Sequence, residues 1–317
     1  MLSGILAAIP GAAAQGVIWG VMALGVYVTY RILDFADLTV DSSMATGAAT
    51  SAMLIISGMN PLLTLVFAIL AGMAAGLITG FLNTKLKIPA ILAGILTQLG
   101  LYSINLRIMD GSPNVALLKQ PVIISLGNIP GALITGAIFA AVVIAVLYWF
   151  FGTELGCAIR ATGNNRKMVR AQGVNTDTTK IIALVISNGL VGLAGGLLAQ
   201  YQGSANVNMS RGAIVIGLAS VILGEVIFGA RFSFAYQLGA VVCGSIIYQI
   251  VIAFVIQLGL STNDMKLFSA ITVAIALSVP TIKQNIAQRK PINVMDDVEP
   301  TDAPPVQEAS VDTAGKE

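Results

Sequence analysis

The sequence predicts an all-α integral membrane protein, a polytopic helical bundle of about nine transmembrane segments with broken or re-entrant pieces. Of the 317 residues, 56% are hydrophobic and 10% are charged, whereas a soluble domain carries about 25% charged residues. The apolar residues form runs of roughly 20, the length at which a helix crosses a bilayer. The 33 glycines fit this class, because small residues let helices approach closely in lipid.

Nine apolar stretches are candidates for these segments. The second is short and rich in Ala, Ser and Thr, and glycine interrupts the seventh. In chain order they are Ala12–Tyr30, Ser43–Ser57, Pro61–Leu82, Pro89–Arg107, Pro130–Phe151, Ile181–Tyr201, Gly212–Phe228, Phe234–Gln257 and Met265–Pro280. The polar, Pro-containing remainder, 283–317, is expected to be a disordered cytoplasmic tail, which leaves 1–282 as the membrane domain.

The basic residues indicate the orientation of the chain. The interval 154–180 holds five basic residues against two acidic ones, and cytoplasmic loops of membrane proteins carry the excess of Lys and Arg. Placing this interval in the cytoplasm also places Arg31, Lys85 and Lys87 there. We therefore expect the N-terminus outside and the C-terminus in the cytoplasm.

The interval 154–180 has a pattern of its own. Ile159, Met168 and Val169 fall at helical spacing, which predicts a short amphipathic helix. We expect Gly163 to interrupt this helix and Gly173 to end it in the left-handed conformation. The prediction is a structured cationic element on the cytoplasmic side that needs a partner.

Three acidic residues, Asp34, Asp37 and Asp41, lie between the first two apolar runs. One interpretation is a cytoplasmic loop in which Asp41 and Ser42 cap the next helix. The other is a non-helical segment that dips inward and lines a pathway, because irregular backbone is tolerated at membrane depth only beside a cavity.

Uncharged polar residues also interrupt the apolar runs. Gln98 and Asn105 are seven positions apart, so they share one helix face. Such residues either form hydrogen bonds between helices or line a polar conduit. Glu225 has two interpretations as well, a local ion pair with Arg231 or a proton-carrying carboxylate.

The sequence lacks the residues that metal sites, phosphate-binding loops and hydrolase active sites require. There is no His and there are two Cys, so a metal site lacks its usual ligands. No phosphate-binding loop of the form G-x-x-x-x-G-K-[ST] and no nucleophile elbow occurs. We expect no catalytic residue, no bound metal or cofactor and no nucleic-acid partner.

The segment GCAIRATGNNRKMVRAQGV, followed by SNGLVGLAGGLLA, resembles the permease subunits of bacterial ABC importers for branched-chain amino acids, ribose and nucleosides. The resemblance rests on Gly156, Ala158, Arg160, Ala161, Asn164 or Asn165, Ala171 and Gly173, then Ser187, Gly192, Ala194, Gly195 and Gly196. Val169–Arg170 and Asn188–Gly189 depart from the pattern.

Two further stretches agree with this resemblance. FADLTVDSSMATGAA is similar to an early segment of the family, most closely in an amino-acid branch with aromatic amino acids among its suggested substrates. VIGLASVILGEVIFGARF is similar to a late segment, with Glu225 where glycine is common. The three stretches occur in the family's order, and the resemblance covers most of Gly16–Pro280.

The resemblance implies a transport subunit of the inner membrane without enzymatic activity, for a small polar solute and most closely an amino acid. Its partners would be an ABC ATPase dimer that holds ATP and Mg²⁺, a second permease chain, an extracytoplasmic substrate-binding protein and membrane lipid. The residues expected to couple the permease to the ATPase are Gly156, Ala158, Arg160, Ala161, Asn164, Asn165, Ala171 and Gly173. The residues expected along the translocation pathway are Asp37, Thr39, Asp41, Ser42, Gln98 and Asn105. The alternatives are an ion-coupled secondary transporter, an importer for sugars or nucleosides, and a membrane scaffold that transports nothing.

Overall fold

The computed structural model describes residues 2–118, 120–229 and 233–257, together with Ala274 and Ser278. These residues belong to one compact unit, Met1–Pro280. The predicted ninth segment, Met265–Pro280, lies almost wholly outside the described residues, and the predicted tail, 283–317, lies wholly outside them.

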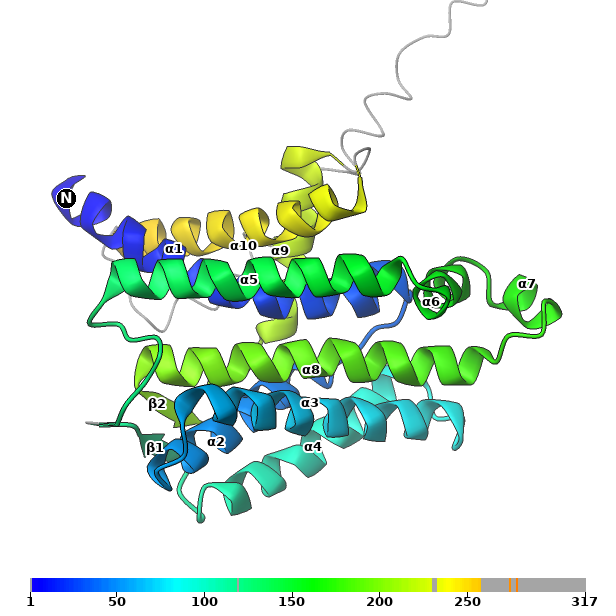
Figure 1. Cartoon of the computed structure of the whole chain (residues 1–317), viewed down its shortest axis with the longest axis horizontal. Coiled ribbons are helices and arrows are strands. Elements are labelled where there is room, and N and C mark those ends of the chain that lie inside the picture. The colour runs from blue at the N-terminus through cyan, green and yellow to red at the C-terminus, as the bar shows by residue number, and fades with distance from the viewer. Residues whose placement is uncertain (1, 119, 230–232, 258–273, 275–277, 279–317) are drawn as a thin grey trace, which may run out of the picture. The chain divides into compact units, whose positions relative to one another are not determined.

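The described part of the chain is almost entirely helical (Figure 1). Two short strands, β1 (Asn114–Ala116) and β2 (Ser204–Asn206), pair in antiparallel register. The helices are α1 (Leu2–Tyr27) with a π-helical extension η1 (Val28–Ile32), α2 (Val40–Ile56), α3 (Pro61–Thr84), α4 (Ala90–Ile108), α5 (Ile129–Phe151), α6 (Glu154–Asn164), α7 (Arg166–Ala171), α8 (Thr176–Gln202), α9 (Ala213–Phe228) and α10 (Phe234–Gln257).

Six of the described helices are long and apolar enough to cross a membrane. They are α1 with its extension, α3, α4, α5, α8 and α10. The helices α2, with 17 residues, and α9, with 16 residues, are shorter than a full span. The structure thus agrees with a polytopic helical membrane protein, and it does not confirm nine segments.

Local sequence explains where the long helices begin and end. The side chain of Asn60 accepts a hydrogen bond from the Leu62 amide, and that of Asn175 accepts from the Asp177 amide. Both are N-cap bonds, which satisfy amides that have no partner inside the helix. Helix α8 ends at Gly203, which adopts a positive φ of 67°, the left-handed conformation that favours glycine.

Helix α8 is packed between α1, α2 and α3 (Figure 1). Close approach requires glycine at these contacts. A Cβ atom on Gly192 would lie against the Ala68 carbonyl oxygen and 3.1 Å from the Cα of Gly72 on α3. A Cβ on Gly195 would lie against the Met44 carbonyl of α2. The glycine-rich run of α8 therefore serves close helix packing.

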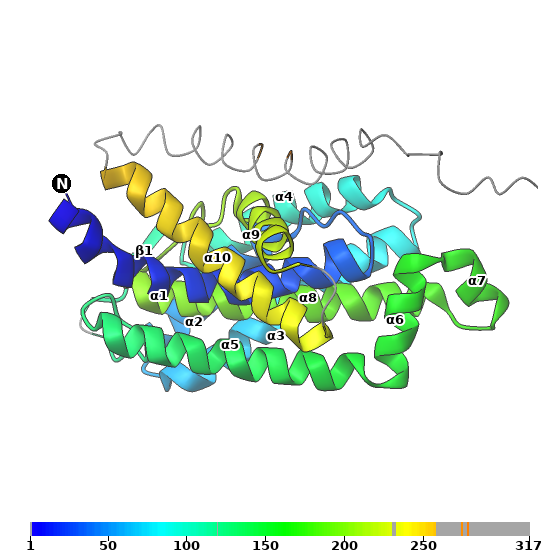
Figure 2. The same ribbon diagram turned by 90° about the horizontal axis from the view of Figure 1, so that it is seen from above.

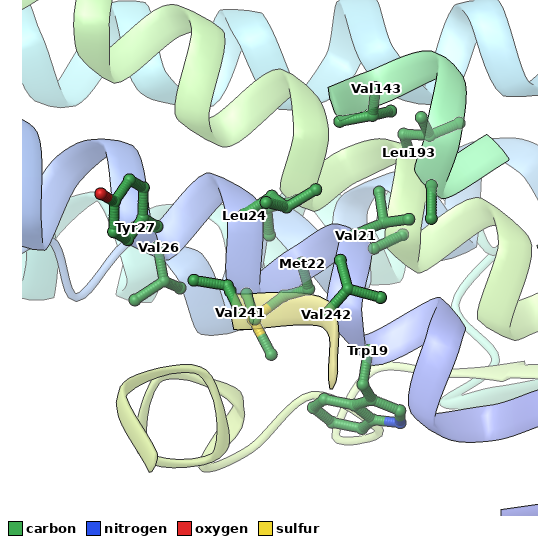
Figure 3. Close-up of a cluster of buried hydrophobic side chains, with 14 of the residues drawn as sticks. Trp19, Val21, Met22, Leu24, Val26, Tyr27, Val143, Leu193, Val241 and Val242 are labelled. Atoms are coloured by element: carbon green, nitrogen blue, oxygen red, sulfur yellow. The ribbon is translucent and has the colours of Figure 1, made fainter. Parts of the chain in front are cut away.

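The main hydrophobic core surrounds α1. Figure 3 shows its side chains meeting those of three other helices, α5, α8 and α10. The labelled residues are Trp19, Val21, Met22, Leu24, Val26 and Tyr27 of α1, Val143 of α5, Leu193 of α8, and Val241 and Val242 of α10. Because its neighbours enclose it, α1 is a central helix of the bundle.

Helix α9 has a direction of its own. It crosses the direction that α1 and α8 share, so Figure 1 shows it upright and Figure 2 shows it nearly end-on. The π-helical end of α1, the start of α8 and the helices α6 and α7 lie together, and we call this the α6 end. The strands β1 and β2 mark the opposite end, which we call the hairpin end (Figure 1).

Candidate functional site

The segment between η1 and α2 enters the interior of the bundle. Residues 34–37 are non-helical, and the chain turns at Asp34, whose φ is 54°. Asp37 lies between two apolar stretches and is 2% exposed, although its side chain can carry a charge. It contacts Asn188, the thirteenth residue of the 27-residue helix α8. An aspartate in this segment therefore reaches the middle of a membrane-spanning helix.

Hydrogen bonds fix Asp37 in place. One carboxylate oxygen accepts from the Thr39 amide at 2.9 Å, and the other accepts from Asn188 Nδ2 at 2.7 Å. Asn188 Oδ1 in turn accepts from Ser43 Oγ at 2.6 Å. This geometry matches the inward-dipping interpretation of the segment, while a role in a pathway stays a prediction.

Asn188 is the residue whose importance the sequence analysis missed. It is named there only as a departure from the family pattern. A carboxamide beside glycine in the middle of a span was the available signal, because buried polar groups require partners. Its partner is 151 positions away, and no local pattern identifies such a partner.

Thr39 belongs to a second chain of hydrogen bonds. Its hydroxyl lies 2.7 Å from the hydroxyl of Thr79 on α3. Thr79 Oγ1 also lies 2.9 Å from Thr97 Oγ1 on α4. All three threonines are buried. These bonds join the start of α2 to α3 and α4.

Asp41 caps a helix, but not the helix predicted. Its carboxylate accepts from the amides of Gly212 and Ile214, each at 3.0 Å, at the start of α9. The Ser210 hydroxyl donates to the Asp41 backbone carbonyl. Helix α2 begins after Thr39 without a side-chain cap bond. Asp41 thus neutralises the positive end of α9, and the interpretation in which Asp41 and Ser42 cap α2 was wrong.

A pocket of about 480 Å³ with both polar and apolar side chains in its wall opens beside Asp41. The start of α2 and the loop before α9 meet there, and α4 supplies the facing wall. Ser42 Oγ donates to the Gln98 backbone carbonyl at 3.1 Å across this pocket. The pocket is lined by Asp41, Ser42, Ile95, Gln98, Leu99, Tyr102, Val207, Asn208, Ser210 and Arg211.

The structure brings three of the six predicted pathway residues together in this pocket, namely Asp41, Ser42 and Gln98. Asp37 and Thr39 are buried in the hydrogen-bond networks described above and do not line it. Asn105 is 1% exposed and lies farther along α4 toward the hairpin end. Arg211 and Asn208 are pocket residues that the sequence analysis did not single out.

The predicted cytoplasmic element consists of two helices, α6 and α7. Asn165 separates them, with an extended backbone at φ −150° and a side chain that accepts from the Met168 amide. Gly163 lies within α6, where a Cβ would meet the Ile32 carbonyl oxygen. The predicted break at Gly163 was therefore wrong. The left-handed conformation predicted for Gly173 is confirmed by its φ of 82°.

The residues expected to contact an ATPase differ in exposure. Gly156 is buried, and a Cβ there would meet the Phe151 backbone. Ala158 and Ala161 are half-buried. Five others are exposed and form the outer surface of α6, α7 and the turn after them, namely Arg160, Asn164, Asn165, Ala171 and Gly173.

Arg160 also packs against the bundle. Its guanidinium carbon lies 4.0 Å from the centroid of the Phe234 ring on α10 and 5.4 Å from that of Phe151 on α5. These cation–π contacts hold α6 on two spans. Arg160 also lines a polar pocket of about 680 Å³ with Arg31 and Asp34, among others, at the α6 end.

Glu225 forms an ion pair, as the simpler of its two interpretations expected, but with a different partner. Its carboxylate lies 2.9 Å from Arg31 Nε of η1. The predicted partner, Arg231, lies outside the described residues. The pair fixes α9 to the end of α1.

A comparison with protein families matches residues 8–277 to the family described as branched-chain amino acid transport system, permease component. The tyrosine transport system permease protein of Clostridioides difficile is 39% identical over 289 residues, which are 91% of this chain and 95% of the relative. An autoinducer 2 import system permease protein of Yersinia pseudotuberculosis is 29% identical over 197 residues, 60% of this chain and 54% of the relative.

Among solved structures, PsaBC from Streptococcus pneumoniae in complex with Fab is similar in fold. The TM-score is 0.54 at 14% identity, and the match covers 87% of this chain and 95% of the other. At this identity the likeness concerns the fold alone.

Proposed function

This chain belongs to the branched-chain amino acid transport system permease family of ABC importers, and we propose that the solute it transports is an amino acid. The observation that carries the proposal is the 39% identity to a tyrosine transport system permease protein along 91% of this chain. Such a match extends through the pocket and through α6 and α7 alike. The family also identifies the chain as a transport subunit rather than an enzyme.

The chemistry of the pocket suits an amino acid. The N-terminal end of α2 lies at its wall, and helix N-termini favour anionic groups such as a carboxylate, whereas the N-terminus of α9 is already capped by Asp41. Arg211 adds a positive charge, and the Gln98 side chain supplies both a donor and an acceptor. The Asp41 carboxylate adds acceptor oxygens for an ammonium group. We therefore propose this pocket as the solute-binding part of the translocation pathway.

Energy would come from a separate chain. We propose that α6 and α7 form the docking site for an ABC ATPase dimer, which holds ATP and Mg²⁺. Their outer surface combines exposed apolar side chains, Leu155 and Met168, with the basic residues Arg166 and Lys167. A second permease chain and an extracytoplasmic substrate-binding protein would complete the importer.

This assignment also sets the orientation of the chain. The α6 end would face the cytoplasm and the hairpin end the outside of the inner membrane, with the N-terminus outside and the C-terminus in the cytoplasm. The excess of basic residues in 154–180 supports this orientation.

The test is purification of the full chain from its native membrane in mild detergent, followed by identification of the proteins that accompany it. We expect a stoichiometric ATPase and an exported binding protein, and an amino acid should be the ligand that raises the melting temperature of that binding protein. A binding protein that responds to sugars or nucleosides only would refute the amino-acid proposal. A chain that purifies alone would refute the proposed partners.

A further inference from the structure

Helices α2 and α4 each carry buried polar atoms without a hydrogen-bond partner among the described residues. Among the described residues, both side-chain polar atoms of Asn105 and the hydroxyl of Thr50 have no partner in the protein. Asn105 is 1% exposed. A buried donor or acceptor left unpaired costs about 1–3 kcal/mol, so native proteins rarely retain such groups without another use for them.

The alignment of α2 with α4 places these groups side by side. A Cβ on Gly94 would lie 2.9 Å from the Leu38 amide nitrogen, and Ser42 bonds Gln98, 56 positions later. Leu38 and Gly94 have the same offset, so the two helices run in the same direction. Continued along the helices, this offset places Thr50 opposite Leu106, directly beside Asn105.

The same alignment connects these groups to the pocket. Ser42, Thr46 and Thr50 recur every four residues, so they follow one face of α2. Gln98 and Asn105 are seven residues apart and share a face of α4. Ser42 and Gln98 line the pocket. A stripe of polar side chains therefore leads from the pocket to Asn105 and Thr50.

Beyond Asn105 the interior becomes apolar. At the hairpin end, side chains of α2, α4 and the loops that carry β1 and β2 form a separate hydrophobic cluster. Its members include Ile55 of α2, Met109 after α4, Leu117 and Val207. The cluster also contains Ala49, which precedes Thr50, and Val207, which lines the pocket, so Asn105 and Thr50 lie at the edge of an apolar region.

We propose that Asn105 and Thr50 form a second binding site for the transported solute, on the hairpin side of the pocket. The carboxamide offers a donor and an acceptor close together, and the hydroxyl offers one of each. This fits a solute that carries both kinds of group on neighbouring atoms, as the ammonium and carboxylate groups of an amino acid do. The inference rests on the proposed function.

The experiment compares Asn105→Leu and Thr50→Val with wild type in the complete transporter, reconstituted with its ATPase and binding protein. Solute uptake and the melting temperature are both measured. Because the replaced atoms have no hydrogen-bond partner in the part of the protein that the structure describes, we expect a melting temperature that is unchanged or higher. Uptake should fall about tenfold for Asn105→Leu, the effect of one lost hydrogen bond to the solute.

A matched control distinguishes an amide that binds the solute from an amide that stabilises the protein. Asn188→Leu removes a carboxamide that does bond within the protein, to Asp37, and should lower the melting temperature. If Asn105→Leu also lowers the melting temperature while uptake per folded complex stays normal, the amide is structural and the proposed site is refuted. Wild-type uptake in both Asn105→Leu and Thr50→Val also refutes it.

The proposed function can fail separately. A wild-type complex that carries another solute and no amino acid refutes the proposed substrate class. A tenfold loss of that uptake in Asn105→Leu, at an unchanged melting temperature, would still support the binding site.

Discussion

Replacement of Gly192 by alanine tests the close contact between α3 and α8. The added Cβ would meet the Ala68 carbonyl oxygen and lie 3.1 Å and 3.2 Å from the Cα and N atoms of Gly72. All three are backbone atoms, so the two helices must move apart. Overpacking of this kind costs about 1–3 kcal/mol, and alanine returns about 0.8–1.0 kcal/mol through its better helix propensity. We expect a net loss of stability of about 0–2 kcal/mol, and a difference of about 1–3 kcal/mol from a glycine-to-alanine change without the clash.

Gly100→Ala on α4 is the matched control, because no atom of another described element lies within 4 Å of its added Cβ. Helix propensity acts there alone, so the control should be as stable as wild type or more so. The assay is thermal unfolding of the purified chain in one detergent. Uptake should fall in Gly192→Ala, since Asn188 lies one helical turn earlier on α8. A melting temperature of Gly192→Ala equal to that of Gly100→Ala would refute the close contact.

Two further substitutions test the two halves of the site. Arg160→Glu should reduce ATP hydrolysis coupled to uptake more than Lys167→Glu does. The reason is that Arg160 also holds α6 on the Phe234 ring, and an exposed cation–π contact contributes about 0.5–1 kcal/mol. Equal losses in the two variants would mean that only the surface charge matters. Asp37→Ala leaves Asn188 Nδ2 and the Thr39 amide without their shared acceptor, which should cost about 1–3 kcal/mol and reduce uptake; uptake and melting temperature equal to wild type would contradict the network.

The sequence predicts the long helices well because their signals are local. The stretch Phe234–Gln257 was predicted with the bounds that α10 has. Pro61 marks the start of α3 in both prediction and structure, because proline fits the first turn of a helix. The start of α2 was placed at Ser43, three residues late. Its first turn is polar, so the apolar pattern does not reveal it.

The contacts that build the site could not be predicted in this way. Asp37 and Asn188 are 151 positions apart, and Asp41 and Gly212 are 171 apart. Each residue was visible as a polar group near or within an apolar run. The partner of each depends on how the helices cross, for which a single sequence holds no periodic signal. The break between α6 and α7 has another cause. Glycine is the weaker helix former of the two residues, but the chain breaks at Asn165 because the Asn165 side chain caps the start of α7.

The three aspartates between the first two apolar runs looked equivalent in the sequence, yet each has a different task. The backbone carbonyl of Asp34 accepts from Arg166 of α7 at 3.2 Å, Asp37 binds Asn188 of α8, and Asp41 caps α9 beside the pocket. Since these positions are three or four residues apart, one short segment links the proposed ATPase-docking helices to the proposed solute pocket. We expect a displacement of α6 and α7 to reach the cap of α9 through only eight residues of backbone, from Asp34 to Asp41. The irregular conformation of this segment follows from that position, because a regular helix through 34–37 could not satisfy all three contacts at once.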